Sequence, residues 1–406
     1  MFFAEQGRDA YNLKSNLDEL FHIIAHTNET LYIDILEKYL ELGDPFLLNL
    51  NMSDLIKILG KEKAFEFIKK YSFQAHEAWL FNLLIAIEES KITSEDIEEL
   101  LKLYKSANFK NMPYHLDYLI KYCKVDENIF LEIMTILINR AENEDNRFVY
   151  TFSIIFNPFT EIFKILDKYM YSDLILFKKA YLVCLNYENH FDHDMMAFNK
   201  LLNFDINFVD DYIVNILSSN DKSISSHDIH NDFSLIWKRD DYETVFLRII
   251  EMIYSLKTKQ LVWRKGELLK AIFINRENQG DIENRADSLI KKYIDLYFSD
   301  NKKIIFIFEL ISEFSEERKI ALISYFIDRN DSFELFKQLS LEPMMRSWDG
   351  SRIPSLQKEI DFFTSLLSLM TTAPLLRHKQ KLQQSIDFLK QDIQRERKSD
   401  FMRDDY

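Results

Sequence analysis

Glycine and proline are so scarce in this chain that few folds are open to it. Each occurs only six times in 406 residues, or about 1.5%, whereas average usage is about 7% for glycine and about 5% for proline. A many-stranded β protein needs glycine-rich hairpin turns, and a doubly wound sheet needs glycine-rich loops between strands and helices. The composition therefore predicts an almost wholly helical chain.

Apolar residues recur at helical spacing along the whole sequence. From Asp9 to Ala25 they are three and four positions apart, which places them on one face of an amphipathic helix. Thr93 and Asp126 each precede a helical run as N-caps, and their spacing indicates a two-helix unit of roughly 35 to 45 residues. The chain is also longer than one compact core normally allows. We expect an irregular α-solenoid of antiparallel, HEAT-like helical hairpins.

Polarity and proline placement divide the chain into four expected regions. The run from Ser218 to His227 is the most polar, and two prolines frame a turn around Trp348. Two apolar stripes after that turn predict a C-terminal αα-hairpin. The expected regions are N-terminal helical repeats at 1–189, a polar connector at 190–232, a second helical-repeat block at 233–340, and the Pro/Trp turn with the hairpin at 341–406.

The net charge and the cysteine content limit the binding partners and the cellular compartment that we expect for this protein. A net charge of -15 argues against binding nucleic acid or an anionic membrane with the whole surface. Cys123 and Cys184 lie in apolar runs and are typical of buried free thiols in a reducing compartment. No long uncharged apolar run and no signal peptide is present. We expect a soluble, cytoplasmic protein, and its start at Met1 is equally compatible with a C-terminal piece of a longer chain.

Two histidine–aspartate clusters raise an enzymatic alternative. Imidazoles and carboxylates at short spacing can bind a divalent metal, and the doublets are similar to those of all-helical, metal-dependent phosphohydrolases of the HD type. Against this, the clusters lie in polar connectors, where such residues usually cap helices. The candidate ligands are His190, His193, Asp194, His227, Asp228 and His230.

Tryptophans beside basic residues form a second candidate set. Such residues can anchor a protein partner or stack on nucleic-acid bases, although a tryptophan at a helix end often packs inside while its basic neighbours face water. Glycine-rich nucleotide loops and the serine-hydrolase elbow are absent from the sequence, and we expect no cofactor. The candidates are Trp237, Arg239, Trp263, Arg264, Lys265, Arg346, Trp348 and Arg352.

The C-terminal region resembles one found at the ends of large bacterial multidomain proteins. The similarity lies in Leu341–Pro343, Ser347–Ser351 with Ile353-Pro354, Phe362–Leu369, and the helix at His378-Lys379. Those proteins carry an upstream STAND-like P-loop NTPase, which this sequence lacks. The resemblance implies a helical sensor or scaffold region, frequently in antiviral defence against phage.

The leading functional hypothesis is thus a non-enzymatic scaffold or sensor that binds a protein partner, because helical solenoids present long grooves to other proteins. A metal-dependent, HD-like hydrolase and a nucleic-acid-binding helical-repeat protein are the alternatives.

Overall fold

Every secondary-structure element in the described part of the chain is a helix, as the scarcity of glycine and proline predicts. The computed structural model describes residues 19–41, 51–70, 76–108, 112, 116–143, 154–187, 191–192, 195–218, 233–256, 262–273, 279–312, 314–339, 341 and 351–404. None of its described helices is long and apolar enough to cross a membrane. The chain divides into two compact units, Met1–Phe208 and Val209–Tyr406.

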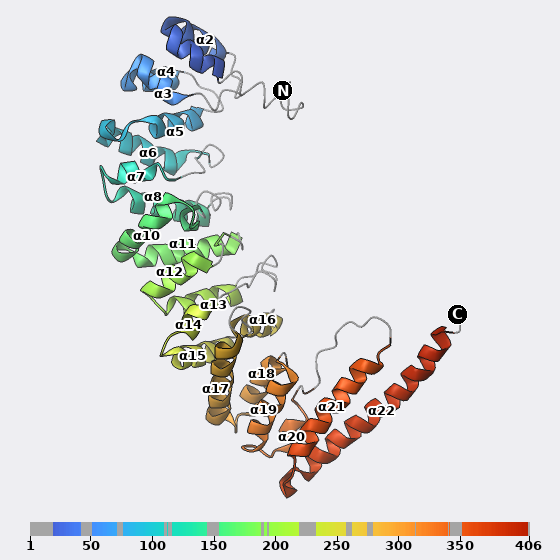
Figure 1. Cartoon of the computed structure of the whole chain (residues 1–406). Coiled ribbons are helices and arrows are strands. Elements are labelled where there is room, and N and C mark those ends of the chain that lie inside the picture. Colours follow the sequence, from blue (N-terminus) through green and yellow to red (C-terminus); the bar gives the residue numbers. More distant parts are fainter. Residues whose placement is uncertain are drawn as a thin grey trace. The chain divides into compact units, whose positions relative to one another are not determined.

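The described part of unit 1 consists of helices that follow one another in chain order (Figure 1). Each packs mainly on helices one to three positions away, as α5 does on α3, α4 and α6. The elements are a helix at 19–27, α2 (Glu29–Glu41), α3 (Met52–Leu59), α4 (Lys61–Lys70), α5 (His76–Ala86), η2 (Glu89–Lys91), α6 (Ser94–Ser106), α7 (Leu119–Cys123), α8 (Ile129–Asn143), η4 (Ile154–Phe156), α10 (Glu161–Ser172), α11 (Leu174–Tyr187) and α12 (Met196–Phe204).

Unit 2 is helical in the same way. The helix α15 packs on α17, α17 on α19, and α19 on α21, while the last two long helices, α21 and α22, lie against each other. The elements are α13 (Phe208–Ser218), α14 (Ser234–Trp237), α15 (Tyr242–Ser255), α16 (Val262–Phe273), α17 (Gln279–Tyr297), α18 (Asn301–Ile311), α19 (Glu316–Ile327), α20 (Phe333–Phe336), α21 (Ile353–Leu369), η7 (Ala373–Leu375) and α22 (Leu376–Asp404).

The region 190–232, expected to be a polar connector, contains helices. Both α12 and α13 lie entirely within it. They form because their apolar faces are buried: Leu201 and Ile213 are 0% exposed. Along the sequence, the boundary between the two compact units falls inside this region, between Phe208 and Val209. The four regions expected from the sequence therefore differ from the two units that the contacts within the chain define.

Aromatic side chains fill the spaces between the helices of unit 1. The ring of Tyr181 on α11 lies 5.5 Å from Phe156, 4.9 Å from Phe191, 6.1 Å from Phe198 and 5.6 Å from Phe208, measured between ring centroids. Three of these four pairs meet edge to face, an arrangement that aligns the positive ring edge with the negative ring face. Many of the phenylalanine and tyrosine side chains thus pack between neighbouring helices.

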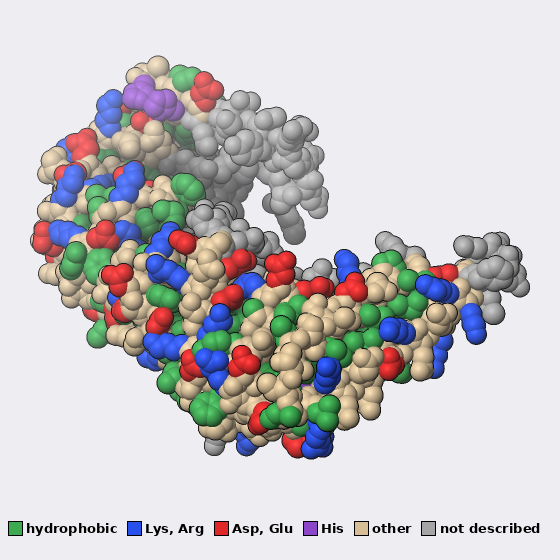
Figure 2. Space-filling view, turned by 60° about the horizontal axis from the view of Figure 1, so that its bottom comes forward, with side chains coloured by type: hydrophobic (Ala, Val, Ile, Leu, Met, Phe, Trp, Pro, Cys, Tyr) green, Lys and Arg blue, Asp and Glu red, His purple; other side chains and the backbone are tan. Residues whose placement is uncertain are grey.

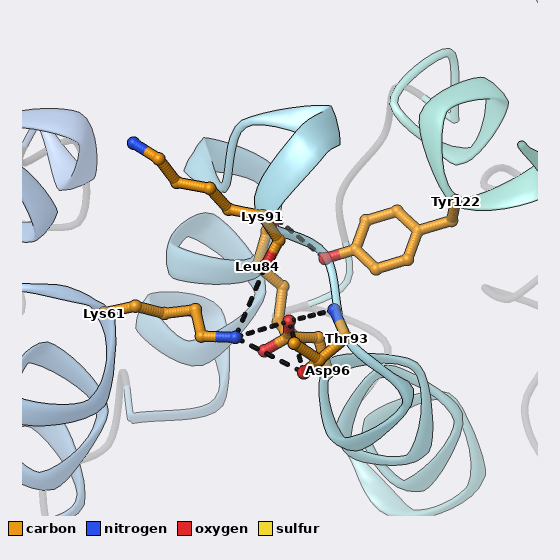
Figure 3. Close-up of polar contacts among 6 residues, drawn as sticks. All are labelled: Lys61, Leu84, Lys91, Thr93, Asp96 and Tyr122. Carbon is orange, nitrogen blue, oxygen red and sulfur yellow. Dashed lines mark hydrogen bonds and ion pairs between the residues drawn. The ribbon is translucent and has the colours of Figure 1, made fainter. Parts of the chain in front are cut away.

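The predicted N-cap at Thr93 is confirmed. Thr93 and Asp96 form a capping box at the start of α6, with the Thr93 N–H donating to Asp96 Oδ2 at 2.7 Å. Lys61, at the start of α4, donates from Nζ to the same oxygen at 2.9 Å (Figure 3). This ion pair is largely buried, because the side chains of Lys61 and Asp96 are 17% and 5% exposed. One carboxylate therefore starts a helix and ties it to the preceding hairpin.

Side chains from later helices supply hydrogen bonds to the carbonyls at helix ends. The C-terminal end of α5 receives two donors from α7: the Tyr122 hydroxyl donates to Leu84 O at 2.8 Å, and Lys121 Nζ donates to the carbonyls of Ile85 and Ile87. The Leu84–Tyr122 bond is drawn in Figure 3. The last four carbonyls of a helix have no partner within it. Burial of the Lys121 ammonium lowers its pKa.

The same device recurs between other helices. Arg140 Nη1 donates to Tyr104 O, near the end of α6, at 2.8 Å. In unit 2, Asn330 Nδ2 donates to Phe298 O, just after α17, at 2.6 Å. Among the described glycines only Gly60 has a positive φ, 79°, and it ends α3 as its position after an apolar run predicts. Several helix ends without such a glycine receive donors from elsewhere in the chain.

We predict that Lys121→Met destabilises unit 1 by about 1–3 kcal/mol, since the carbonyls of Ile85 and Ile87 lose their donor. Urea unfolding followed by circular dichroism, with hydrogen exchange of the α5 amides, would measure this loss. The matched control is Lys124→Met, which removes an exposed ion pair to Glu89 from the same segment and should cost at most about 1 kcal/mol. Equal losses for the two variants would contradict this role of Lys121.

A second prediction concerns acid stability. The hydrogen bond from Lys178 lowers the pKa of Asp205, so this carboxylate stabilises the fold above its unfolded-state pKa and loses that contribution as pH falls toward its folded-state value. Asp205→Asn should therefore lower the urea midpoint at pH 7, and the difference from wild type should shrink as pH falls from about 5 to 3. In a Lys178→Met background the same substitution should have little further effect. A difference that is constant with pH would exclude this linkage.

Candidate functional site

The six metal ligands predicted from the sequence, His190, His193, Asp194, His227, Asp228 and His230, lie outside the described residues. Their neighbour Asp192 is described, and it caps α12. Its carboxylate accepts the N–H groups of Ala197 and Phe198 at 2.9 and 2.8 Å, and the Tyr181 hydroxyl at 2.9 Å. This carboxylate is therefore committed to holding α12 on α11, as capping residues in a connector do.

Trp237, expected to contact a partner, lies inside unit 2. Its side chain is 1% exposed, and its ring centroid lies 4.0 Å from that of Phe246. The indole Nε1 donates to Ile272 O, at the end of α16, at 3.0 Å. Arg285 Nη1 in turn donates to Trp237 O at 2.5 Å. Burial removes Trp237 from the residues that can stack on a ligand in this folded state.

The basic neighbours of the tryptophans are also engaged within the chain. Arg239 donates from Nε and Nη2 to the two oxygens of Asp241 at 2.7 and 2.9 Å, and this pairing raises the pKa of Arg239 and lowers that of Asp241. Lys265 Nζ donates to Tyr254 O at 3.1 Å and to Leu256 O at 2.5 Å, at the end of α15. Burial lowers the pKa of Lys265. Both cations thus have structural partners.

Most of the other residues predicted to contact a partner have side chains outside the described part of the structure. Trp263 and Arg264 belong to α16, but their side chains are outside the described part, as are Arg346 and Trp348 altogether. Arg352 precedes α21, and its N–H donates to Glu396 Oε1 of α22 at 3.5 Å. On the face drawn in Figure 2, acidic and basic side chains are interspersed and no continuous basic patch is seen over the described residues.

An exposed apolar group lies where α10 turns into α11, and the sequence analysis did not single it out. Tyr171 is 82% exposed and Ile175, four positions on, is 79% exposed. The ring of Tyr171 lies 4.7 Å from that of Phe204, at the end of α12, between centroids. We name these three residues the α10–α11 turn surface. Tyr171 lies outside the buried apolar face of α10. Its position off that face is the feature of the sequence that could have indicated its exposure.

A second group, also missed, joins two histidines to a buried aspartate in unit 1. His22 and His26 lie one helical turn apart in the helix at 19–27, and their ring centroids are 4.5 Å apart. Asp54, in the first turn of α3, contacts His22 Nδ1 at 2.7 Å and His26 Nε2 at 3.5 Å. Among the described residues this is the one group of three or more such side chains close enough to hold a metal ion. The i,i+4 histidine spacing was its sequence signal.

The fold and these sites define the class of the protein only broadly: an all-helical protein of two compact units. Comparison with models of known protein families, with curated proteins and with solved structures returned no match. The functional argument therefore rests on the residues themselves.

We predict that Trp237→Phe costs about 1–3 kcal/mol of stability, because phenylalanine keeps a ring in the core but leaves Ile272 O without its donor. The exposed pair offers a control: Arg239→Met removes the contact with Asp241 and should cost about 1 kcal/mol or less. Thermal unfolding measured by circular dichroism would compare the two. An unchanged stability for Trp237→Phe would show that the indole bond contributes nothing.

Proposed function

We propose that this protein is a HEAT-like helical scaffold or sensor that binds a protein partner at the α10–α11 turn surface. The observation that carries the proposal is the exposure of Tyr171 and Ile175, both near 80%, on a hairpin whose other face is well buried. Single exposed apolar residues are common on protein surfaces. Two large ones at one turn, with the ring of Phe204 against that of Tyr171, are typical of a contact surface.

The spacing of inter-helix contacts in unit 1 supports the repeat part of the proposal. Several long-range side-chain hydrogen bonds in unit 1 join residues that are 33 to 38 positions apart. Others range from 27 positions, for Lys178 with Asp205, to 45, for Ile162 with Asp117. A two-helix repeat of roughly 35 to 45 residues brings equivalent positions of neighbouring repeats together at about this separation. Examples are Lys61 with Asp96, and Arg140 with Tyr104.

A protein partner fits the surface chemistry better than a nucleic acid does. Nucleic-acid binding depends on lysines and arginines that are free to contact phosphates. Of the basic residues considered for that role, Arg239 is paired with Asp241 and Lys265 with two carbonyls. The α10–α11 turn surface offers instead an aromatic ring and a branched aliphatic side chain, which suit an apolar anchor of a protein.

The test uses the double variant Tyr171→Asp/Ile175→Asp in a pull-down from the source cells. Because both side chains are exposed, the fold should be retained, with a change of about 0.5 kcal/mol or less in unfolding free energy. Wild type should retain a specific protein that the double variant loses. Mass spectrometry would identify that protein, and binding should then be reproduced with both components purified.

The matched control is Leu376→Asp/Phe388→Asp, which changes two exposed apolar residues of α22 that are 57% and 56% exposed. This variant should retain the partner. If the double variant at Tyr171 and Ile175 binds the purified partner as tightly as wild type, the α10–α11 turn surface is not the binding site. If no protein is retained specifically by wild type, the scaffold proposal fails.

A further inference from the structure

We propose that His22, His26 and Asp54 form a binding site for a divalent transition-metal ion of the zinc class. The site lies in unit 1 on the helix at 19–27 and on α3, elements that do not include the α10–α11 turn surface. It is independent of the proposed partner binding. Figure 2 shows histidine side chains gathered at one place on the surface.

The spacing of the two histidines places both imidazoles on one face of a helix. Residues four positions apart are neighbours on the helix surface. Their rings stand nearly perpendicular, at 79°, with centroids 4.5 Å apart. Their side chains are 50% and 42% exposed, so an ion can reach both from solvent. This pair can therefore act as two ligands to one ion without any change in the backbone.

Asp54 completes the group from a different helix. Its Oδ2 lies 2.7 Å from His22 Nδ1 and its Oδ1 lies 3.5 Å from His26 Nε2, so the carboxylate lies between the two rings. One ligand atom from each of the three residues can be chosen so that all lie within 4.8 Å of one another. Around a tetrahedral zinc ion, with bonds of about 2.0–2.2 Å, donor atoms lie roughly 3.3 Å apart. Small rotations of the two exposed rings would close that difference.

The buried carboxylate of Asp54 favours the binding of a cation at this site. Its side chain is 8% exposed, and its ion-pair partners among the described residues are the two histidines. An imidazole, unlike a lysine or arginine, carries no permanent charge at neutral pH. A buried carboxylate is costly unless a cation or several hydrogen bonds compensate it. A divalent ion would supply that positive charge.

Tyr32, on α2, is a further buried polar group in unit 1. Its side chain is 1% exposed, and its hydroxyl has no hydrogen-bond partner in the described structure. Burial, and after it the charge of Asp54, raise the pKa of Tyr32. Buried polar groups usually have a hydrogen-bond partner, so a bound water is a natural partner for this hydroxyl.

The ligand types indicate which ions fit. Two imidazole nitrogens favour zinc and its transition-metal neighbours, whereas calcium and magnesium prefer oxygen ligands throughout. Three protein ligands fill three positions of a tetrahedral ion and leave the fourth for water or an exogenous group. The site is thus of the open kind, which can hold a further ligand.

The experiment is a titration of the full-length, untagged chain, stripped of metal with a chelator, with zinc by calorimetry and with cobalt by absorption spectroscopy. We expect one ion per chain and, for cobalt, visible bands of a low-coordinate site. His26→Gln should weaken zinc binding about 100-fold or more, since even loss of an outer-shell partner costs about 10–100-fold. The double variant His22→Gln/His26→Gln should lose the site. Both histidines are exposed, and circular dichroism would verify that the variants stay folded.

The matched control replaces the four connector histidines, His190, His193, His227 and His230, with glutamine and should bind zinc like wild type. If wild type shows no saturable zinc binding at micromolar concentrations, the proposal is overturned and the contacts of Asp54 are ordinary hydrogen bonds. If His22→Gln/His26→Gln binds as tightly as wild type, it is overturned as well. Binding lost only in the connector variant would place the metal at the connector and equally refute the site at Asp54.

Discussion

The carbonyl oxygens at the ends of buried helices need hydrogen-bond donors, and this requirement organises much of the structure. Many proteins meet it with a glycine in the left-handed conformation, but this chain has only six glycines. Lysine, tyrosine and tryptophan side chains from other helices take over. Lys121 and Tyr122 serve α5, Lys265 serves α15, and Trp237 serves α16. Each bond joins the end of one helix to a side chain of another, so these bonds add to the apolar packing between helices.

This use of polar side chains changes how the surface is understood. A basic residue beside a tryptophan suggests a binding site in the sequence, yet Trp237, Arg239 and Lys265 all have partners within unit 2. The groups left for function are those that the packing does not use. In unit 1 these include the exposed Tyr171 and Ile175 and the pair of exposed histidines over Asp54. The two proposals rest on different helices and different chemistry.

Local features were predictable wherever neighbouring residues decide the conformation. The helical content followed from composition, and the capping box at Thr93 and the glycine end at Gly60 followed from residue type and position. Ile304–Phe308, a run that a strand could also use, is part of α18, in keeping with an all-helical chain. The helices inside 190–232 were missed, because polar residues around them outweighed the apolar faces of α12 and α13.

The sequence by itself determined that the described chain is helical and where several of its helices begin and end, because these properties depend on composition and on contacts within a few residues. Tertiary structure alone decided which side-chain donor bonds to which helix-end carbonyl, and which of the proposed metal ligands lie together. Asp54 reaches His22 only because α3 packs beside the helix at 19–27, and Trp237 reaches Ile272 across a similar gap in the chain. Such pairs are made by packing between helices, and no local spacing encodes them.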